Sequence, residues 1–87
     1  MLKISQDGKA DKIVTLKLEG RIAGPWVAEV RKACEGLLNE GRALQLDLAD
    51  VSFVDVTGTA AISNLKSRGV GLENCSPFVA EQLKGLQ

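Results

Sequence analysis

Residues 50–59, DVSFVDVTGT, place a carboxylate and a hydroxyl two positions apart, where an apolar run gives way to a helical pattern. Asp55 is followed by Thr57 and Gly58. The free N–H groups and the positive dipole end of a helix N-terminus tolerate negative charge. A phosphate on Thr57 would add a charge of about −1.5 to −2 beside Asp55 and would repel another acidic surface. Thr57 is therefore a candidate phosphorylation site.

Helix capping is the simpler interpretation of the same residues. Thr and Asp before a helix most often serve as N-caps, each stabilising by about 1 kcal/mol. Either Asp55 or Thr57 could fill that position. Gly58 would let the backbone turn tightly or approach another segment closely, and we expect it to keep the approach to Thr57 open.

Several kinds of chemistry are disfavoured by residue type. The chain has no histidine, which removes the commonest general base and metal ligand. Cys34 and Cys75 form no CxxC motif. We expect both to serve as small, buried or half-buried apolar side chains of a protein in a reducing compartment. Asp47, Asp50 and Asp55 could hold Mg²⁺, but alternation turns Asp47 outward and Asp50 is predicted in a turn. We predict no catalytic residue, no metal site and no cofactor.

Length and composition indicate one domain, residues 1–87. Eleven basic and eleven acidic residues leave no net charge to attract nucleic acid or anionic lipid. Three aromatic residues are too few for a base-stacking platform, and GRIAGP lacks the spacing of a phosphate-binding glycine loop. No apolar run approaches about 18 residues, and the N-terminus lacks a secretory pattern. We expect a cytoplasmic protein that neither binds nucleic acid nor inserts directly into a membrane.

Hydrophobic periodicity predicts seven elements. The predicted strands cover residues 1–4, 12–20, 42–50 and 70–74, and the predicted helices cover residues 24–41, 58–68 and 76–86. A turn is predicted over QDGKAD, residues 6–11. In the two long strands alternate residues are apolar and should be buried: Val14, Leu16, Leu18, Leu44, Leu46 and Leu48. The apolar stripes of the first and last helices include Trp26, Val27, Val30, Ala33, Cys34, Leu37, Leu38, Phe78, Val79, Leu83 and Leu86.

The helix boundaries carry their own signals. Pro25 suits the first turn of the long helix, and Gly41 suits the position after its end. Ser76 is expected to cap the last helix, with Pro77 as its first residue. Lys66 and Arg68 near the end of the short helix are expected to be solvated, where basic side chains suit the dipole.

The element order β-β-α-β-α-β-α predicts an α/β fold. Strand–helix–strand units of this length require right-handed crossovers and a largely parallel sheet. Alternating strands bury only one face, which places the helices on that face. We predict an open, mixed, mostly parallel four-stranded sheet with helices on one face. Regulatory contacts in such sheets gather where strands end and helices begin, which is the position of residues 55–58.

The chain resembles the STAS domain, named for sulfate transporters and anti-sigma-factor antagonists. The resemblance is carried by TLKLEGRI, LLNEGRALQLDLADVSFVDVTG and NCSPFVAEQLKGL. The family pattern of an aspartate, two small hydroxyl residues and a glycine falls on Asp55, Val56, Thr57 and Gly58. In antagonist members the second hydroxyl residue accepts phosphate from a partner kinase, and Thr57 matches it. The sequence departs from the family where Val56 replaces the first hydroxyl, where Ala23 replaces an acidic residue, and in a shortened segment between residues 58 and 76.

The resemblance implies a non-enzymatic regulatory module, like an anti-sigma-factor antagonist, that docks a kinase or anti-sigma protein. The docking segments would be residues 20–24, residues 51–59 and the exposed face of the short helix, and phosphorylation of Thr57 would break the contact. The expected partner-binding residues are Arg21, Ile22, Asp55, Val56, Thr57, Gly58 and Thr59. The alternative is a cytoplasmic accessory subunit of a membrane transporter of the lipid ABC type, which binds the permease and is never phosphorylated. An enzyme is the least favoured interpretation.

Overall fold

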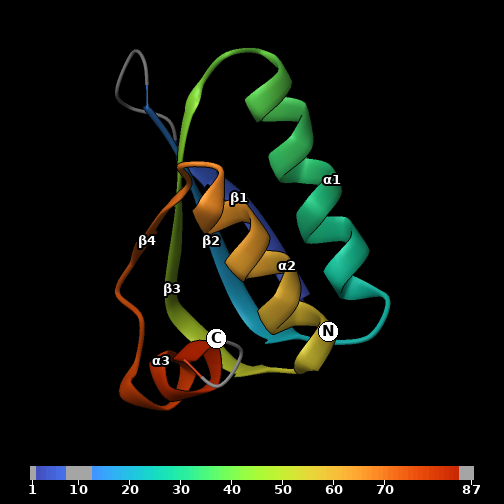
Figure 1. The fold of residues 1–87 in the computed structure, drawn as a ribbon, viewed down its shortest axis with the longest axis vertical. Helices are drawn as coiled ribbons and strands as arrows, with labels where there is room; N and C mark the ends of the chain where they lie inside the picture. Colours follow the sequence, from blue (N-terminus) through green and yellow to red (C-terminus); the bar gives the residue numbers. More distant parts are fainter. Residues whose placement is uncertain (1, 8–12, 85–87) are drawn as a thin grey trace.

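The computed structural model describes residues 2–7 and 13–84 and contains the seven elements in the predicted order (Figure 1). They are β1 Leu2–Asp7, β2 Ile13–Ile22, α1 Trp26–Asn39, β3 Ala43–Val54, α2 Val56–Ser67, β4 Gly71–Glu73 and α3 Pro77–Lys84. The sheet order is β1-β2-β3-β4, with β1 antiparallel to β2 and the other pairs parallel. This confirms the predicted open, mixed, mostly parallel four-stranded sheet.

The core lies between the sheet and the helices that cover one of its faces (Figure 1). The alternate leucines of β2 and β3 are buried as predicted, and they share one core cluster with Val30 and Cys34 of α1. On the opposite face Thr15, Lys17 and Gln45 are only half-buried. One face of the sheet therefore remains accessible to water, as alternating strands require. No helix in the described part of the chain is long and apolar enough to cross a bilayer.

Two bulges make β3 longer than its pattern predicts. The register with β2 skips one residue of β3 between Asp47 and Asp50 and another between Val51 and Phe53. An extra residue in one strand bends it and increases its local twist. The buried positions therefore leave strict alternation after residue 48 and fall on Val51 and Val54. The strand ends four residues later than predicted, directly before Asp55.

The aspartates of β3 support this irregular segment. The Asp47 carboxylate accepts a hydrogen bond from Ala49 N at 3.0 Å, inside the first bulge. Asp50 lies in the strand and not in the predicted turn, and it forms an ion pair with Lys17 at 3.2 Å. Sequence alternation alone could not reveal either arrangement, because pairing with β2 sets both.

The helix ends largely follow the predicted signals. Pro25 occupies the N-cap position of α1, one residue before its predicted place, and Gly41 has a φ of 77° just past the helix end. Ser76 Oγ accepts a hydrogen bond from Val79 N at 3.2 Å, so Ser76 caps α3 as predicted. Gln6 and Asp7 were predicted in a turn but lie in β1, which continues three residues beyond its predicted end at residue 4. The rest of the predicted turn, residues 8–11, and Leu86 lie outside the described residues.

An ion pair joins α1 to the C-terminal end of α2. Both oxygens of the Glu35 carboxylate accept hydrogen bonds from the Arg68 guanidinium, at 2.6 and 2.9 Å. These bonds hold the pKa of Glu35 below its usual value. Arg68 is exposed, as expected, and it also links the end of α2 to α1 through this ion pair.

Candidate functional site

Asp55 links three segments at one end of the sheet. It is the N-cap of α2, and its Oδ1 accepts a hydrogen bond from Gly58 N at 2.7 Å. Its Oδ2 accepts a hydrogen bond from Gly24 N at 3.0 Å, in the loop between β2 and α1. Its own backbone N donates to Ile22 O at 3.1 Å, at the end of β2. Asp55 thus fixes the start of α2 relative to β2 and to the loop before α1.

These hydrogen bonds also stabilise the charged form of the Asp55 carboxylate. The bond from Gly24 N, followed by those from Gly58 N and the Thr57 hydroxyl, lowers the pKa of Asp55 below its usual value. Hydrogen bonds to a carboxylate favour ionisation because they are stronger to the anion. Asp55 is therefore a fixed negative charge at neutral pH, and it is a weak base.

Thr57 presents an exposed hydroxyl beside that charge. Its Oγ1 donates a hydrogen bond to Asp55 Oδ1 at 2.8 Å, and the side chain is exposed in the first turn of α2. A hydroxyl that donates its single hydrogen still has lone pairs on its oxygen. The geometry therefore orients the Thr57 oxygen so that it can accept a group or a partner's donor, while Asp55 performs the capping.

Gly58 is necessary for packing and does not face outward. A Cβ at this position would lie 2.6 Å from Ile22 O and 2.9 Å from Val54 Cγ1. Only glycine lets the first turn of α2 approach the ends of β2 and β3 this closely. The prediction of a close backbone approach is confirmed. The expectation that Gly58 keeps access to Thr57 open is wrong, because Gly58 is buried on the side of α2 that faces Ile22 and Val54.

The other predicted contact residues divide into buried and accessible ones. Ile22 is fully buried in the core, and Thr59 is 3% exposed with its Oγ1 donating to Asp55 O at 2.7 Å. In this structure neither side chain offers a surface to a partner. Arg21 is exposed and lies over the Phe53 ring, 5.0 Å from its centroid. The predicted residues that reach the surface are Arg21, Asp55, Val56 and Thr57, and their role in docking stays a prediction.

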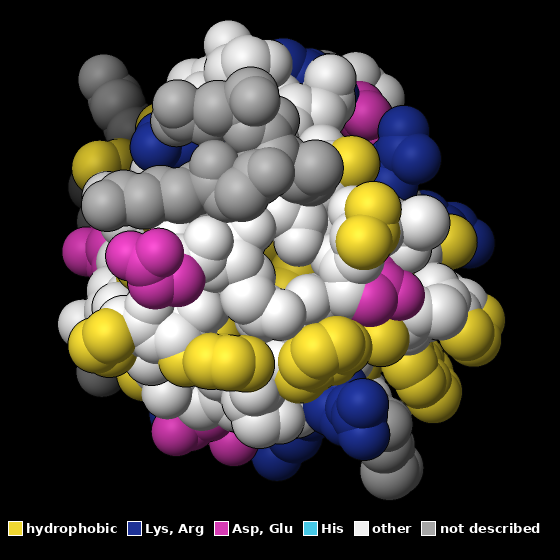
Figure 2. All heavy atoms as spheres, turned by 60° about the horizontal axis from the view of Figure 1, so that its bottom comes forward, with side chains coloured by type: hydrophobic (Ala, Val, Ile, Leu, Met, Phe, Trp, Pro, Cys, Tyr) yellow, Lys and Arg dark blue, Asp and Glu magenta, His cyan; other side chains and the backbone are white. Residues whose placement is uncertain are grey.

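Large apolar side chains are exposed around this end of the molecule. Val56 is 74% exposed, Phe78 57% and Trp26 38%, although the stripes of the first and last helices predicted burial for Trp26 and Phe78. Figure 2, which brings this end forward, shows hydrophobic side chains distributed across it among charged ones. Both aromatic residues lie in the first turn of their helices, where a side chain can extend beyond the sheet.

Sequence reasoning did not identify Arg31. Thr57 lines a shallow hollow together with Gly24, Val27, Ala28 and Arg31. Arg31 is the only charged residue among these five, and it lies one helical turn after Val27. The helical spacing was visible in the sequence, but the proximity to Thr57 depends on how α1 and α2 pack.

The three aspartates considered as Mg²⁺ ligands have separate partners. Asp47 accepts hydrogen bonds from Ala49 N and Asn74 Nδ2, and Asp50 pairs with Lys17. Asp55 is occupied by backbone N–H groups and by Thr57. The described residues contain no group of three or more acidic or cysteine side chains placed to bind a metal ion.

Comparisons with known proteins agree with this fold. Similar solved structures include the anti-sigma factor antagonist SpoIIAA in its unphosphorylated form, with a TM-score of 0.73 and 17% identity over 94% of this chain and 82% of that one. An antagonist from Mycobacterium paratuberculosis has a TM-score of 0.78 and 17% identity over 99% and 80%. Phosphorylated SpoIIAA from Bacillus has a TM-score of 0.72 and 15% identity over 95% and 82%.

At these identities the structural likeness establishes a shared fold. A comparison with curated protein sequences finds no match. The family model of the STAS domain, however, matches residues 6–85. The chain therefore belongs to the STAS domain family.

Proposed function

We propose that this protein is a non-enzymatic regulatory module that docks a protein partner through a surface formed by Arg21, Asp55, Val56 and Thr57, here called the docking surface. The observation that carries the proposal is the exposed Thr57 hydroxyl held by Asp55 at 2.8 Å, next to the apolar Val56 side chain. Two of the similar structures are of SpoIIAA, an anti-sigma factor antagonist, in unphosphorylated and phosphorylated forms. The proposed partner is accordingly an anti-sigma factor with serine/threonine kinase activity in the cytoplasm.

Phosphorylation of Thr57 is the proposed switch. In the transfer, a bond forms between Thr57 Oγ1 and the γ-phosphorus of ATP, the bond to the β-phosphate oxygen breaks, and ADP leaves. Asp55 orients the hydroxyl, and the hydroxyl proton passes to water after the new bond has formed. Phosphoryl transfer depends chiefly on positioning and charge stabilisation, so the low basicity of Asp55 is compatible with this role.

The phosphate would change both the charge and the hydrogen bonding of the docking surface. It removes the hydroxyl hydrogen that Thr57 donates to Asp55 and adds a charge of about −1.5 to −2 near that carboxylate. Arg31, in the same hollow, is the positive group placed to form a charge-assisted hydrogen bond with the phosphate. A partner that presents acidic or apolar groups to Val56 and Thr57 would then be repelled.

Two substitutions test the switch. The partner is first recovered by pull-down from cytosolic and membrane fractions, with the intact mass of the recovered chain measured. We expect Thr57→Ala to bind it constitutively and Thr57→Glu to bind at least about tenfold less tightly, a difference of about 1.4 kcal/mol. Asn39→Glu, which adds the same charge at the exposed C-terminal end of α1, opposite the end of the molecule that carries Thr57 (Figure 1), should bind like the unmodified protein. Equal affinity for all variants would refute the switch and the docking surface together.

A second candidate function is an accessory subunit of a membrane transporter. The exposed apolar side chains of Val56, Trp26 and Phe78 favour it, because an apolar surface suits a lasting contact that needs no phosphate. Recovery of a membrane permease together with an unphosphorylated chain would support this function over the kinase switch.

A further inference from the structure

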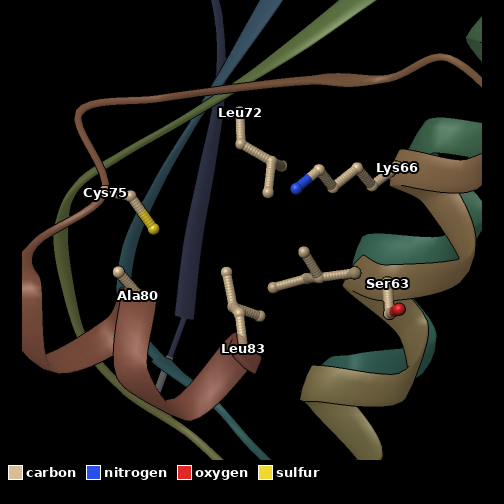
Figure 3. A pocket seen from close by; sticks show the side chains of 7 residues that line it. Ser63, Lys66, Leu72, Cys75, Ala80 and Leu83 are labelled. Carbon is tan, nitrogen blue, oxygen red and sulfur yellow. The ribbon is translucent and has the colours of Figure 1, made fainter. Parts of the chain in front are cut away.

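A cavity of about 320 Å³ lies between α2, β4 and α3 (Figure 3). It is lined by Ile62, Ser63, Lys66, Leu72, Cys75, Ala80 and Leu83. None of these residues belongs to the docking surface. Most of this lining belongs to the segment between residues 58 and 76, which the sequence indicates is short for this family. Within that segment β4 has only three residues.

The walls of the cavity are mainly apolar. Leu72 from β4 and Leu83 from α3 point toward each other across it, with Ala80 on the same side as Leu83 (Figure 3). Ile62 closes the cavity from α2 and is fully buried. Pockets that bind small molecules are typically lined by apolar side chains with a few polar groups that orient the ligand, at volumes of roughly 300–1,000 Å³. The cavity has this composition and lies at the lower end of that range, which limits the ligand to a small molecule.

Lys66 supplies the only charge in the lining. Its side chain extends from α2 and its ammonium group points toward Leu72 and the interior of the cavity (Figure 3). No described carboxylate forms an ion pair with it, whereas Lys3, Lys17 and Arg68 each have one. An ammonium group directed at an apolar cavity without an internal counter-ion is complementary to an anion from outside.

Cys75 forms part of the wall and is not a reactive group. Its sulfur points into the cavity (Figure 3). Burial raises the pKa of the Cys75 thiol above its usual value, although the nearby Lys66 acts in the opposite direction. The thiol is therefore protonated at neutral pH, and the thiolate is the form that acts as nucleophile. Binding in this cavity would accordingly be non-covalent.

We propose that this cavity binds a small amphiphilic monoanion, a carboxylate with a short hydrocarbon tail. The carboxylate would pair with Lys66, and the tail would lie among Ile62, Leu72, Ala80 and Leu83. One ammonium group matches one negative charge, and a polar body would find few partners because Ser63 and Cys75 are the only other lining residues with a polar side-chain group. The proposal is independent of phosphorylation at Thr57.

NMR titration of the whole chain with hexanoate tests this site. We expect saturable shifts of the Ile62, Leu72 and Leu83 methyl resonances with hexanoate, and none with hexylamine at the same concentrations. Lys66→Met keeps the length of the apolar stem and removes the charge, and it should weaken hexanoate binding at least about threefold. Lys3→Met removes the same charge from β1 and should leave binding unchanged.

A second variant tests the cavity itself. Ala80→Phe places a ring in the space beside Leu83 and should abolish the saturable shifts. Shifts that do not saturate, equal shifts with hexylamine, or equal affinity of the Lys66→Met and Lys3→Met proteins would each overturn the proposal. Because Lys66 is exposed on α2, its replacement tests the proposal even if Ala80→Phe fails to fold.

Discussion

The two ends of α2 differ in whether the charged side chain found there has a partner within the protein. At its N-terminus, Asp55 accepts hydrogen bonds from Gly24, Gly58 and Thr57, so its charge is compensated inside the protein. Near its C-terminal end, Lys66 points toward an apolar cavity and pairs with no described carboxylate. The hydrogen bonds to Asp55 fix the position of its carboxylate, whereas the ammonium group of Lys66 is available to a ligand. The first region is therefore suited to a precise protein contact and the second to a small anion.

The largest expected effect concerns the strand beneath both regions. Leu46 is fully buried in β3 and pairs in register with Leu72 of the cavity wall. Leu46→Ala should lower the free energy of unfolding by roughly 2–5 kcal/mol, because it leaves a cavity in the core. Denaturant unfolding measures this loss. A change under about 0.5 kcal/mol is typical of surface substitutions. Such a result would mean that Leu46 does not pack in the core beneath the two sites.

A substitution at Gly58 tests whether the first turn of α2 packs tightly against the end of β2. Gly58→Ala should destabilise the protein by about 1–3 kcal/mol, because the added Cβ meets Ile22 O at 2.6 Å. The matched control is Gly36→Ala in α1, where a Cβ meets nothing within 4 Å, and where alanine should be neutral or stabilise the helix by up to about 1 kcal/mol. If thermal unfolding ranks the two variants equally, the close approach of α2 to β2 is not as described.

The pH dependence of the free energy of unfolding tests whether the hydrogen bonds to the Asp55 carboxylate stabilise the protein. A carboxylate whose folded-state pKa is lowered takes up a proton more readily in the unfolded chain, so its stabilising effect is present above its unfolded pKa, about 3.9. That effect is lost as the pH falls through the folded pKa. Asp55→Asn should therefore reduce stability at pH 7 and reduce the loss of stability between neutral pH and pH values below about 4. An unchanged stability profile would show that the hydrogen bonds to Asp55 contribute nothing.

The smallest expected effect concerns Lys66. Because no described carboxylate pairs with it, Lys66→Met should change the free energy of unfolding by less than about 0.5 kcal/mol. The measurement is denaturant unfolding in buffer without carboxylate ions. A loss above about 1 kcal/mol would mean that Lys66 has a structural role, and the contrast with Asp55 would disappear.

Much of the fold could be predicted because local patterns determine it. The alternating leucines of β2 and β3, the cap at Ser76 and the glycine after α1 each depend on neighbouring residues alone. The bulges in β3 could not be predicted in this way, since they depend on pairing with β2, and they extend the strand to Asp55. The position of the candidate site at the start of α2 could be inferred because it follows an apolar run.

The composition of the two sites was less predictable. Ile22 was an expected partner-binding residue because the predicted strand ends at Gly20, yet β2 continues to Ile22 and its side chain is buried. Thr59 is polar, but its hydroxyl is satisfied by the backbone of its own helix. Arg31 lines the same hollow as Thr57, and Lys66 lines the same cavity as Cys75, only through the packing of separate elements. Arrangements of this kind have no signal in local sequence.

The central proposal is that the state of the Thr57 hydroxyl controls a protein contact. The most direct measurement compares the affinity of the recovered partner for the unmodified chain and for the same chain with phosphothreonine incorporated at position 57. We predict that phosphorylation weakens binding at least about tenfold, or about 1.4 kcal/mol, while the fold is retained. Equal affinity for the two forms would contradict the account, and Thr57 would then be an exposed residue beside a helix cap.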